Sequence, residues 1–375
     1  MKIKHLIVYY PSMERGGIEN NLHTLINYFT KKNIKVTLIS SKFIKKDVDL
    51  KLKKINFLRI RSKFNFLFVP HRLITALAGV RKLLEAFSYS KRNETVVLSM
   101  QSSMVSIIVS RICSFKVVAR NSEDALSSTL YADNYVLAYT VFILRFFIYN
   151  LANGILTNSY GSKNSLNYFI IKKKKLKTIY NPYVRKIKNF NLNRSSRKNI
   201  ILSVGRLTKQ KDMGTLIKGF SIFSKINPSY KLIILGDGPD RKKLQQLTNH
   251  LNLKKKILFK GWVKNTNKYF ENAKIFVLTS LYEGLGNVLI DAVNYEVPCI
   301  YTDCKSGPRE ILLGKKGGYI IKLRDKYDLA KKINLVLNNY NDSKEKIKYA
   351  KKKINRFYFK RVCRQYLDYL NKILY

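Results

Sequence analysis

The sequence predicts an α/β protein with two successive domains, each built on a parallel sheet. Three observations lead to this prediction. The chain has 375 residues, short β-branched runs alternate with helix-length apolar periodicity, and the alternation stops at a basic stretch and then begins again. A chain of this length exceeds one ordinary core and suits two domains. Strands that alternate with helices are typical of a parallel sheet with crossover helices.

The first half of the chain supplies five expected strands and three expected helices. The strands are β-branched runs at residues 3–10, 35–40, 95–100, 116–119 and 154–157. Apolar residues at helical spacing fill the intervals at residues 18–30, 68–87 and 136–151. The last of these helices is nearly all apolar, contains Arg145 and leads into a strand, which favours burial.

A basic stretch without periodicity separates the two halves. Residues 151–200 hold twelve basic side chains and no acidic one, and Pro182 lies where the periodicity is lost. We interpret this charge as the solvated face of a linker rather than as a binding site. The expected boundaries are a first domain at 1–180, a linker at 181–198 and a second domain at 199–356. The terminal helix at 357–374 is expected to pack back on the first domain.

The second half repeats the same pattern. Strands are expected at residues 200–204, 231–235, 257–260, 275–279 and 297–302, and helices at residues 215–226 and 241–251. Two such halves are expected to place a ligand cleft between the carboxyl ends of their facing sheets.

The charge of the chain is its most unusual global property. Lys and Arg total 72 against 23 acidic residues, a formal net charge of +49. Such an excess attracts anionic partners of any kind. Three interpretations compete: a compositional bias toward Lys, Ile, Asn, Tyr and Phe, contact with an anionic membrane, and nucleic-acid binding. No nucleic-acid motif accompanies the charge, so we expect no nucleic-acid partner.

Cysteine use and apolar runs favour a cytoplasmic protein. The four cysteines are scattered and show no CxxC pair or metal-ligand spacing. The apolar run after Met1 is short and lacks a small-residue cleavage site, so it reads as a first strand rather than a signal peptide. No uncharged apolar stretch approaches the ~20 residues that span a bilayer.

Residues 279–291 carry the clearest chemical signal. A strand ends at Thr279, and Glu283-Gly284-Leu285-Gly286-Asn287 then turns into a helix. Two glycines allow close backbone approach to a ligand, and the free amides and dipole of a helix start suit a phosphate or a sugar hydroxyl. Glu283 and Asp291 can accept hydrogen bonds from hydroxyl pairs. These residues alone leave open the alternative of a helix-capping acid and a solvent-facing Asp.

Two further turns follow strands in this half. Gly205-Arg206-Leu207 comes directly after a strand, and Arg206 and Lys211 lie in the same turn, where two cations could neutralise a diphosphate leaving group. Residues 306–308, Ser-Gly-Pro, form a tight loop before another helix.

In their order along the chain, these motifs resemble retaining glycosyltransferases of family 4, which have the GT-B fold. The resemblance covers nearly the whole chain. It rests on Arg15-Gly16-Gly17-Ile18-Glu19, Asn158-Ser159, Tyr180-Asn181-Pro182, Gly205-Arg206-Leu207 with Lys211, Gly236-Asp237-Gly238-Pro239, the segment from Glu283 to Asp291, and Ser306-Gly307-Pro308-Arg309-Glu310-Ile311.

The resemblance implies two Rossmann-like α/β domains facing each other across a cleft, and roles for particular residues. Catalytic roles fall on Glu283, which would contact hexose hydroxyls, and on Arg206 and Lys211, which would hold the donor diphosphate. Asp291 would bind the ribose diol, where the family usually has Glu. The remaining donor-binding positions implied are Gly16, Gly17, Gly284, Leu285, Gly286, Asn287 and Val288. Transfer would proceed with retention, without a metal or other cofactor; Asp47-Val48-Asp49 matches a metal-binding DxD formally but lies in a Lys-rich coil.

The first domain gives weaker candidates for acceptor contacts. Residues 119–124 follow a strand; Arg120 and Asn121 are expected to contact substrate, and Glu123 or Asp124 to orient the acceptor. The alternative is a polar loop that caps the next helix. Residues 64–87 combine aromatic and basic side chains, as in a membrane-surface helix or a core helix with basic edges.

The sequence therefore predicts a glycosyltransferase that moves a hexose or N-acetylhexosamine from a UDP-sugar to a glycan or lipid-linked acceptor in surface polysaccharide or lipopolysaccharide biosynthesis. We expect it to be peripheral on the inner face of the plasma membrane and to contact the anionic membrane surface. The alternatives are a basic nucleic-acid-binding protein, a GT-B epimerase or phosphorylase, and a noncatalytic relative.

Overall fold

A computed structural model describes residues 2–12, 17–42, 55–61, 71–100, 103–132, 134–188, 197–304 and 306–375. The chain forms two compact units. The first unit combines Met1–Tyr183 with Phe357–Tyr375, and the second is Val184–Arg356. The segment expected as a linker is therefore divided: residues 181–183 belong to the first unit and residues from 184 to the second.

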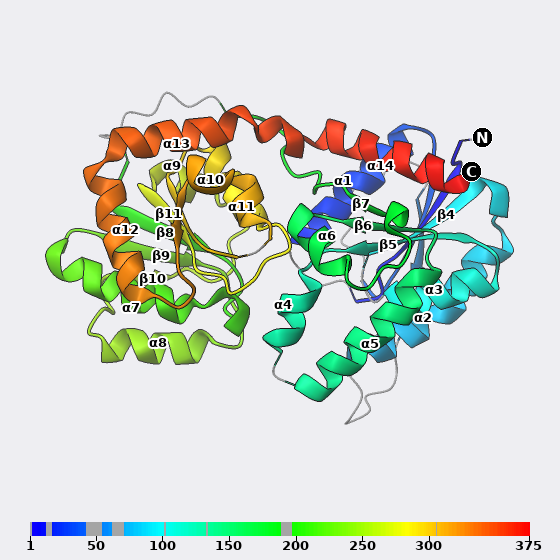
Figure 1. Ribbon diagram of the computed structural model, residues 1–375, viewed down its shortest axis with the longest axis horizontal. Coiled ribbons are helices and arrows are strands. Elements are labelled where there is room, and N and C mark those ends of the chain that lie inside the picture. Colours follow the sequence, from blue (N-terminus) through cyan, green and yellow to red (C-terminus); the bar gives the residue numbers. More distant parts are fainter. Residues whose placement is uncertain are drawn as a thin grey trace. The chain divides into compact units, whose positions relative to one another are not determined.

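The first unit contains a parallel sheet with, in the described residues, the strand order β3-β2-β1-β4-β5-β6-β7 (Figure 1). The order reverses between β1 and β4, as it does in doubly wound folds. The strands are β1 (His5–Tyr9), β2 (Lys35–Ser40), β3 (Ile55–Arg59), β4 (Thr95–Ser99), β5 (Lys116–Asn121), β6 (Gly154–Thr157) and β7 (Leu176–Thr178).

Helices cover both faces of this sheet because successive strand side chains point in opposite directions. Leu6 and Val8 of β1 join one core, with α1 (Gly17–Lys31) and α14 (Phe359–Leu374). Ile7 and Tyr9 join the other core. The helices of that second face are α2 (His71–Ser88), α3 (Ser103–Ile112), α4 (Ala125–Leu130), α5 (Tyr135–Leu151) and α6 (Tyr160–Leu166).

The C-terminal helix α14 is part of the first unit, although the whole second unit precedes it in the chain. Its buried side chains, Tyr366 and Leu370 among them, lie in the same core as Leu6 and Val8. The Ile3 amide donates a hydrogen bond to Asn371 Oδ1 at 2.9 Å. Both the apolar contacts and this bond tie α14 to the first strand's side of the sheet.

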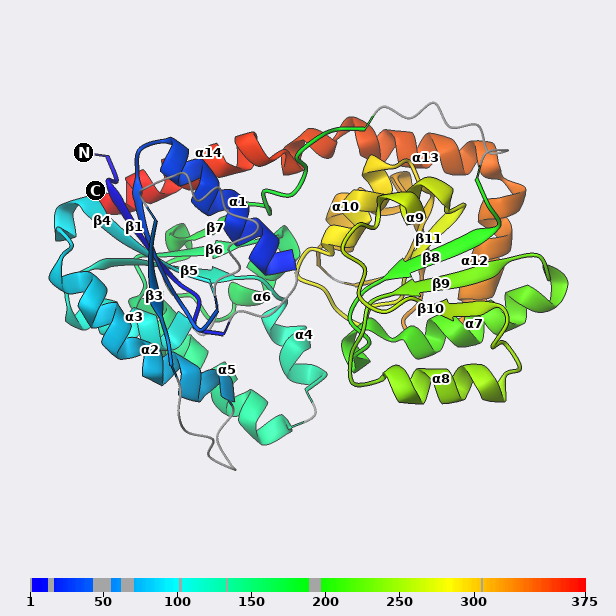
Figure 2. The same ribbon diagram turned by 180° about the vertical axis from the view of Figure 1, so that it is seen from behind.

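The second unit repeats the architecture with the strand order β10-β9-β8-β11-β12-β13, again parallel throughout (Figure 2). Its strands are β8 (Ile200–Val204), β9 (Lys231–Leu235), β10 (Ile257–Phe259), β11 (Ile275–Leu278), β12 (Cys299–Thr302) and β13 (Tyr319–Ile321). Its helices are α7 (Met213–Ile226), α8 (Arg241–His250), α9 (Asn267–Asn272), α10 (Asn287–Asn294), α11 (Pro308–Ile311), α12 (Lys326–Asn338) and α13 (Tyr340–Lys352).

The fold confirms the expected α/β class with two parallel, Rossmann-like sheets. The strands expected at residues 35–40, 154–157, 200–204 and 231–235 have the predicted bounds. The short strands β3, β7 and β13 were not predicted.

The expectation that α5 is buried is wrong. Its described side chains include Val136, Ile143 and Phe147, which are 80%, 56% and 64% exposed. A nearly all-apolar helix carries little periodic signal to separate a buried from an exposed face, so sequence alone could not settle this. No helix in the described part of the chain is both long and apolar enough to cross a membrane.

Candidate functional site

The site predicted in the second unit lies where three loops leave the carboxyl ends of β8, β11 and β12. The strand order reverses between β8 and β11, which pair directly. Ligands of doubly wound sheets bind outside the carboxyl ends of the strands at such a reversal. We call residues 205–211 the β8 loop, 279–286 the β11 loop and 303–307 the β12 loop; Lys305 lies outside the described residues.

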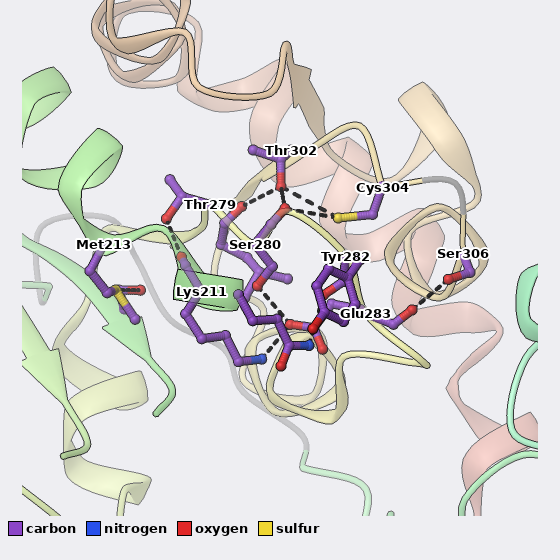
Figure 3. Close-up of polar contacts among 12 residues, drawn as sticks. Lys211, Met213, Thr279, Ser280, Tyr282, Glu283, Thr302, Cys304 and Ser306 are labelled. Carbon is purple, nitrogen blue, oxygen red and sulfur yellow. Dashed lines mark hydrogen bonds and ion pairs between the residues drawn. The ribbon is translucent and has the colours of Figure 1, made fainter. Parts of the chain in front are cut away.

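Lys211 and Glu283 meet between the β8 and β11 loops (Figure 3). Lys211 Nζ forms an ion pair with Glu283 Oε1, and the two side chains are only 14% and 8% exposed. Ser280 Oγ donates a second hydrogen bond to the same carboxylate oxygen at 2.7 Å. The structure thus brings together two residues that were predicted as catalytic from motifs 72 positions apart.

Hydrogen bonds to backbone carbonyls fix the β8 loop against the β11 loop. The Leu281 amide donates to the Gln210 carbonyl at 2.8 Å, and Gln210 Nε2 donates to the Tyr282 carbonyl at 2.9 Å. Thr279 Oγ1 donates to the Lys211 carbonyl at 3.0 Å. The Lys211–Glu283 pair is therefore held by the loops themselves and not only by its own attraction.

The β12 loop supports the β11 loop from the other side. Cys304 Sγ donates to the Ser280 carbonyl at 3.0 Å, and Thr302 Oγ1 donates to the same carbonyl. Burial raises the pKa of the Cys304 thiol to about 12, so it stays protonated and remains a donor. Ser306 Oγ donates to the Glu283 carbonyl. Motif reasoning missed Ser280, Thr302 and Cys304; the available signal was their place at strand ends, since Thr302 ends β12 and Ser280 and Cys304 lie two residues past β11 and β12.

Glycines set the backbone of the β11 and β12 loops. Gly286 has φ +84° and precedes α10, and Gly307 has φ +70° and precedes α11. A Cβ on Gly307 would lie 2.5 Å from the Leu285 carbonyl oxygen, so only glycine lets the two loops approach this closely. The approach places the buried residues Gly284 and Leu285 beside the start of α10.

The first turn of α10 presents the remaining donor-binding candidates. Asn287 and Val288 begin this helix and are half-buried, and Asp291 lies one turn further along it, also half-buried. The first amides of a helix lack intrahelical acceptors and carry partial positive charge. This end of α10 can therefore hold an anionic or hydroxyl-bearing group next to Glu283.

Arg206 lies on the β8 loop and is exposed. The Leu207 amide donates to the Asp237 carbonyl at 3.0 Å, which joins the β8 loop to the Gly236-Asp237-Gly238 turn after β9. The stem of Lys211 packs over Gly205, where a Cβ would lie 3.3 Å from Lys211 Cδ. These contacts hold the backbone next to Arg206 and the stem of Lys211.

The candidates in the first unit are placed differently. Arg120 is 1% exposed; its Nε donates to Tyr366 Oη at 2.5 Å, one Nη donates to Ser122 Oγ at 2.7 Å, and the other donates to Asn181 Oδ1. This guanidinium connects β5 to α14 and to the end of the first unit. Such placement favours a structural role over direct substrate contact.

The residues after Arg120 are engaged locally. Asn121 Nδ2 donates to the Glu123 carbonyl at 2.6 Å, and the exposed Glu123 carboxylate lies 3.4 Å from Arg145. Asp124 caps α4 by accepting from the Ser127 amide at 2.8 Å. Of the predicted glycine loop, Gly17 is the exposed first residue of α1, whereas Gly16 and the DxD at residues 47–49 lie outside the described residues.

Comparison with known proteins gives a family match that coincides with the second unit. Residues 184–353 match the family model described as "Glycosyl transferases group 1". An uncharacterized glycosyltransferase of Methanocaldococcus jannaschii is 32% identical over 280 residues, covering 69% of this chain and 66% of the relative.

Two comparisons extend over the whole chain. A Campylobacter jejuni α-1,4-N-acetyl-D-galactosaminyltransferase, whose name gives the acceptor as a GalNAc-GalNAc-diNAcBac-PP-undecaprenol, is 25% identical over 100% of this chain and 99% of the relative. The crystal structure of Anabaena HepE in complex with UDP and glucose superposes with a TM-score of 0.78 at 17% identity, covering 98% of this chain and 100% of that one.

Proposed function

Because the chain belongs to the group 1 family of glycosyltransferases, we propose that it transfers a hexose or N-acetylhexosamine from a UDP-sugar, with retention, to a glycan or lipid-linked acceptor of a surface polysaccharide or lipopolysaccharide. The observation that carries the proposal is the buried Lys211–Glu283 pair at the strand-order reversal of the second unit. The UDP-bound neighbour and the polyprenol-linked acceptor of the Campylobacter relative support the choice of donor and acceptor.

In the proposed donor site, residues of the three loops and of α10 bind different parts of the UDP-sugar. Arg206 and Lys211 hold the diphosphate, and the amides at the start of α10 assist them. An ammonium group has several N–H donors, so Lys211 can pair with Glu283 and bind phosphate at once. Glu283 accepts hydrogen bonds from hexose hydroxyls, and Asp291 accepts them from the ribose diol.

The proposed chemistry follows from this arrangement. The acceptor hydroxyl attacks the anomeric carbon on the face from which UDP departs, so a new C–O bond forms as the bond to the β-phosphate oxygen breaks. The hydroxyl proton passes to the departing phosphate, and UDP leaves. Arg206 and Lys211 stabilise the negative charge that develops on the diphosphate, where fixed cations in a partly buried site are most effective.

The direct test is transfer of radiolabel from a panel of UDP-hexoses and UDP-N-acetylhexosamines to lipid extracted from bacterial membranes. Glu283→Gln is expected to lower kcat/KM by about 10²–10³-fold, the usual effect of removing a contact to developing charge or to the reacting sugar. Glu296→Gln is the matched control, because Glu296 forms a comparable ion pair with Lys351 at 2.7 Å at the opposite, amino end of the strands.

Three outcomes would overturn the proposal. Transfer from no donor, with wild type and Glu283→Gln alike in UDP binding, would favour a noncatalytic relative. Conversion of a UDP-sugar without acceptor would favour an epimerase, and salt-sensitive duplex binding without UDP binding would favour a nucleic-acid-binding protein.

We further propose that the enzyme works at an anionic membrane surface. A net charge of +49 would concentrate the protein on such a surface. Sedimentation with anionic vesicles at low salt, lost at high salt, is the expected result. If the protein does not sediment with the vesicles at low salt, compositional bias would explain its positive charge.

A further inference from the structure

The helix α5 turns an apolar face to solvent. Its exposed positions span about half of the helix circumference at about 100° per residue. Among them only Thr140 is polar, and its hydroxyl donates to the Val136 carbonyl at 2.9 Å, so it needs no water. The exposed positions are Val136, Leu137, Tyr139, Thr140, Ile143, Leu144, Phe146, Phe147 and Leu151.

The polarity of this helix is the reverse of that of an ordinary surface helix, which turns charge outward. The charged residue of α5, Arg145, has a side chain only 11% exposed; it lies 3.4 Å from the Glu123 carboxylate and 5.8 Å from the centre of the Tyr149 ring. The charge thus faces the protein and the apolar side chains face outward. A contiguous apolar surface of this kind marks an interaction site.

A cationic segment adjoins the C-terminal end of α5. Asn150 Nδ2 donates to the Phe169 carbonyl at 2.7 Å, and the Ile171 amide donates to Asn150 Oδ1 at 2.8 Å. Lys175 Nζ donates to the carbonyls of Asn150 and Ala152 at 2.9 and 2.8 Å. These bonds hold residues 168–175 beside the end of the helix.

The side chains of this adjoining segment are apolar and basic. Tyr168 and Ile171 are 77% and 69% exposed, and Lys172, Lys173 and Lys174 are exposed. Residues 151–200 contain no acidic residue to offset them. An apolar face next to uncompensated lysines is the combination that binds the boundary between lipid headgroups and acyl chains.

We propose that the outward face of α5, together with Tyr168, Ile171 and Lys172–Lys174, docks on an anionic lipid membrane. The helix lies in the plane of the interface, with its apolar side chains among the acyl chains and the lysines at the phosphates. We call this surface the α5 face. The purpose of docking, to bring the enzyme to a lipid-linked acceptor, rests on the proposed function. The physical docking needs no donor site.

Charge decides between a membrane and a second copy of the chain as the occupant of the α5 face. Two copies would each carry a formal charge of +49, and their repulsion opposes an interface that also holds exposed lysines. A lipid surface rich in phosphatidylglycerol supplies both the apolar volume and the negative charge. In Figure 1, α5 lies beside α3 of the first unit, and the two helices are in contact.

Flotation of the full chain with phosphatidylcholine vesicles, with and without one part in three of phosphatidylglycerol, tests the proposal. Ile143→Ser/Phe147→Ser is expected to lower the partition coefficient at least tenfold, and so is Lys172→Gln/Lys173→Gln/Lys174→Gln. Ile226→Ser is the matched control, because Ile226 is 75% exposed at the end of α7 in the second unit, and it should float as wild type does.

A fluorescent probe reports insertion directly. The chain has a single tryptophan, Trp262, in the second unit. In Trp262→Phe/Phe147→Trp, the emission should shift to the blue on anionic vesicles and be quenched by brominated lipids. Unchanged emission from vesicle-bound protein would overturn the proposal, and so would flotation of Ile143→Ser/Phe147→Ser at the level of wild type.

Two further measurements keep the alternatives separate. Light scattering that shows a lipid-free dimer of wild type and a monomer of Ile143→Ser/Phe147→Ser would assign the α5 face to a second copy and overturn the membrane proposal. Glu283→Gln should float as wild type, whereas Ile143→Ser/Phe147→Ser should keep wild-type UDP affinity. Flotation through the α5 face without any UDP binding would support docking while the proposed transferase function alone failed.

Discussion

The Lys211→Met variant removes the cation of the buried pair but keeps a side chain of similar length to pack over Gly205. Glu283 would then be a carboxylate only 8% exposed, with the Ser280 hydroxyl still bound at 2.7 Å. Removing one partner of a buried pair costs about 3–5 kcal/mol. Because Ser280 remains, we expect the low end, a loss of about 3 kcal/mol in the free energy of unfolding of the second unit.

The double variant Lys211→Met/Glu283→Gln should recover part of this loss, because it leaves no unpaired charge. A coupling energy of about 1.5 kcal/mol or more is expected for groups in direct contact. Urea unfolding followed by Trp262 fluorescence measures the second unit specifically, since it holds the chain's one tryptophan. Transfer activity should stay low in the double variant, because stability returns but the diphosphate contact does not.

The matched control for this prediction is Lys351→Met. Lys351 pairs with Glu296 at 2.7 Å, with side chains 12% and 18% exposed, so its loss should destabilise the same unit to a similar degree. It should change kcat/KM per folded molecule only a few-fold, whereas Lys211→Met should lower it about 10²–10³-fold. A Lys211→Met enzyme as stable as wild type, or a Lys351→Met enzyme equally impaired in transfer, would refute the reasoning.

Three further predictions concern both units. Gly307→Ala should cost about 1–3 kcal/mol and weaken UDP binding in calorimetric titration, because its Cβ would meet the Leu285 carbonyl; Gly314→Ala, with φ +64° but nothing within 4 Å of its Cβ, is the control. Burial and the nearby positive charge of Lys35 lower the pKa of His5 to about 4, so the folded state favours the neutral imidazole. The contribution of His5 to the free energy of unfolding is therefore complete above pH 6.5 and falls by up to about 3 kcal/mol toward pH 4. Urea unfolding at a series of pH values measures this dependence, and His5→Gln should remove it. Arg120→Met should lower the stability of the first unit by about 1.5–3 kcal/mol in thermal unfolding, while UDP affinity stays unchanged. Arg120→Lys should be destabilised as well, because an ammonium group lacks the planar fork of a guanidinium.

Each of these has a clear opposing result. Equal UDP affinities for Gly307→Ala and Gly314→Ala would show that the two loops can separate without effect. A pH dependence that persists in His5→Gln would assign it to other groups. Loss of transfer in Arg120→Met at full stability would return Arg120 to the substrate-contact role expected from the sequence.

Local sequence signals account for the parts of the fold that were predicted. Residues 35–40 and 231–235 are β-branched or aliphatic runs that end at a change of composition, and both are strands with those bounds. The glycines of the β11 and β12 loops likewise predicted the turns that precede α10 and α11. The three-residue strands β7 and β13 are too short to carry a period, so they emerged only from pairing with their neighbours.

The sequence by itself determined the two-sheet α/β class and the motifs of the donor site, because strand and helix periodicity and glycine turns act over a few neighbouring residues. Tertiary structure decided how those pieces are used. It joined Lys211 to Glu283 across 72 positions through the pairing of β8 with β11, and it covered Arg120 with Tyr366 from 246 positions away. It also left the apolar face of α5 outside the core. Which face of a nearly all-apolar helix meets the protein depends on what packs against it, and the local pattern records little of that.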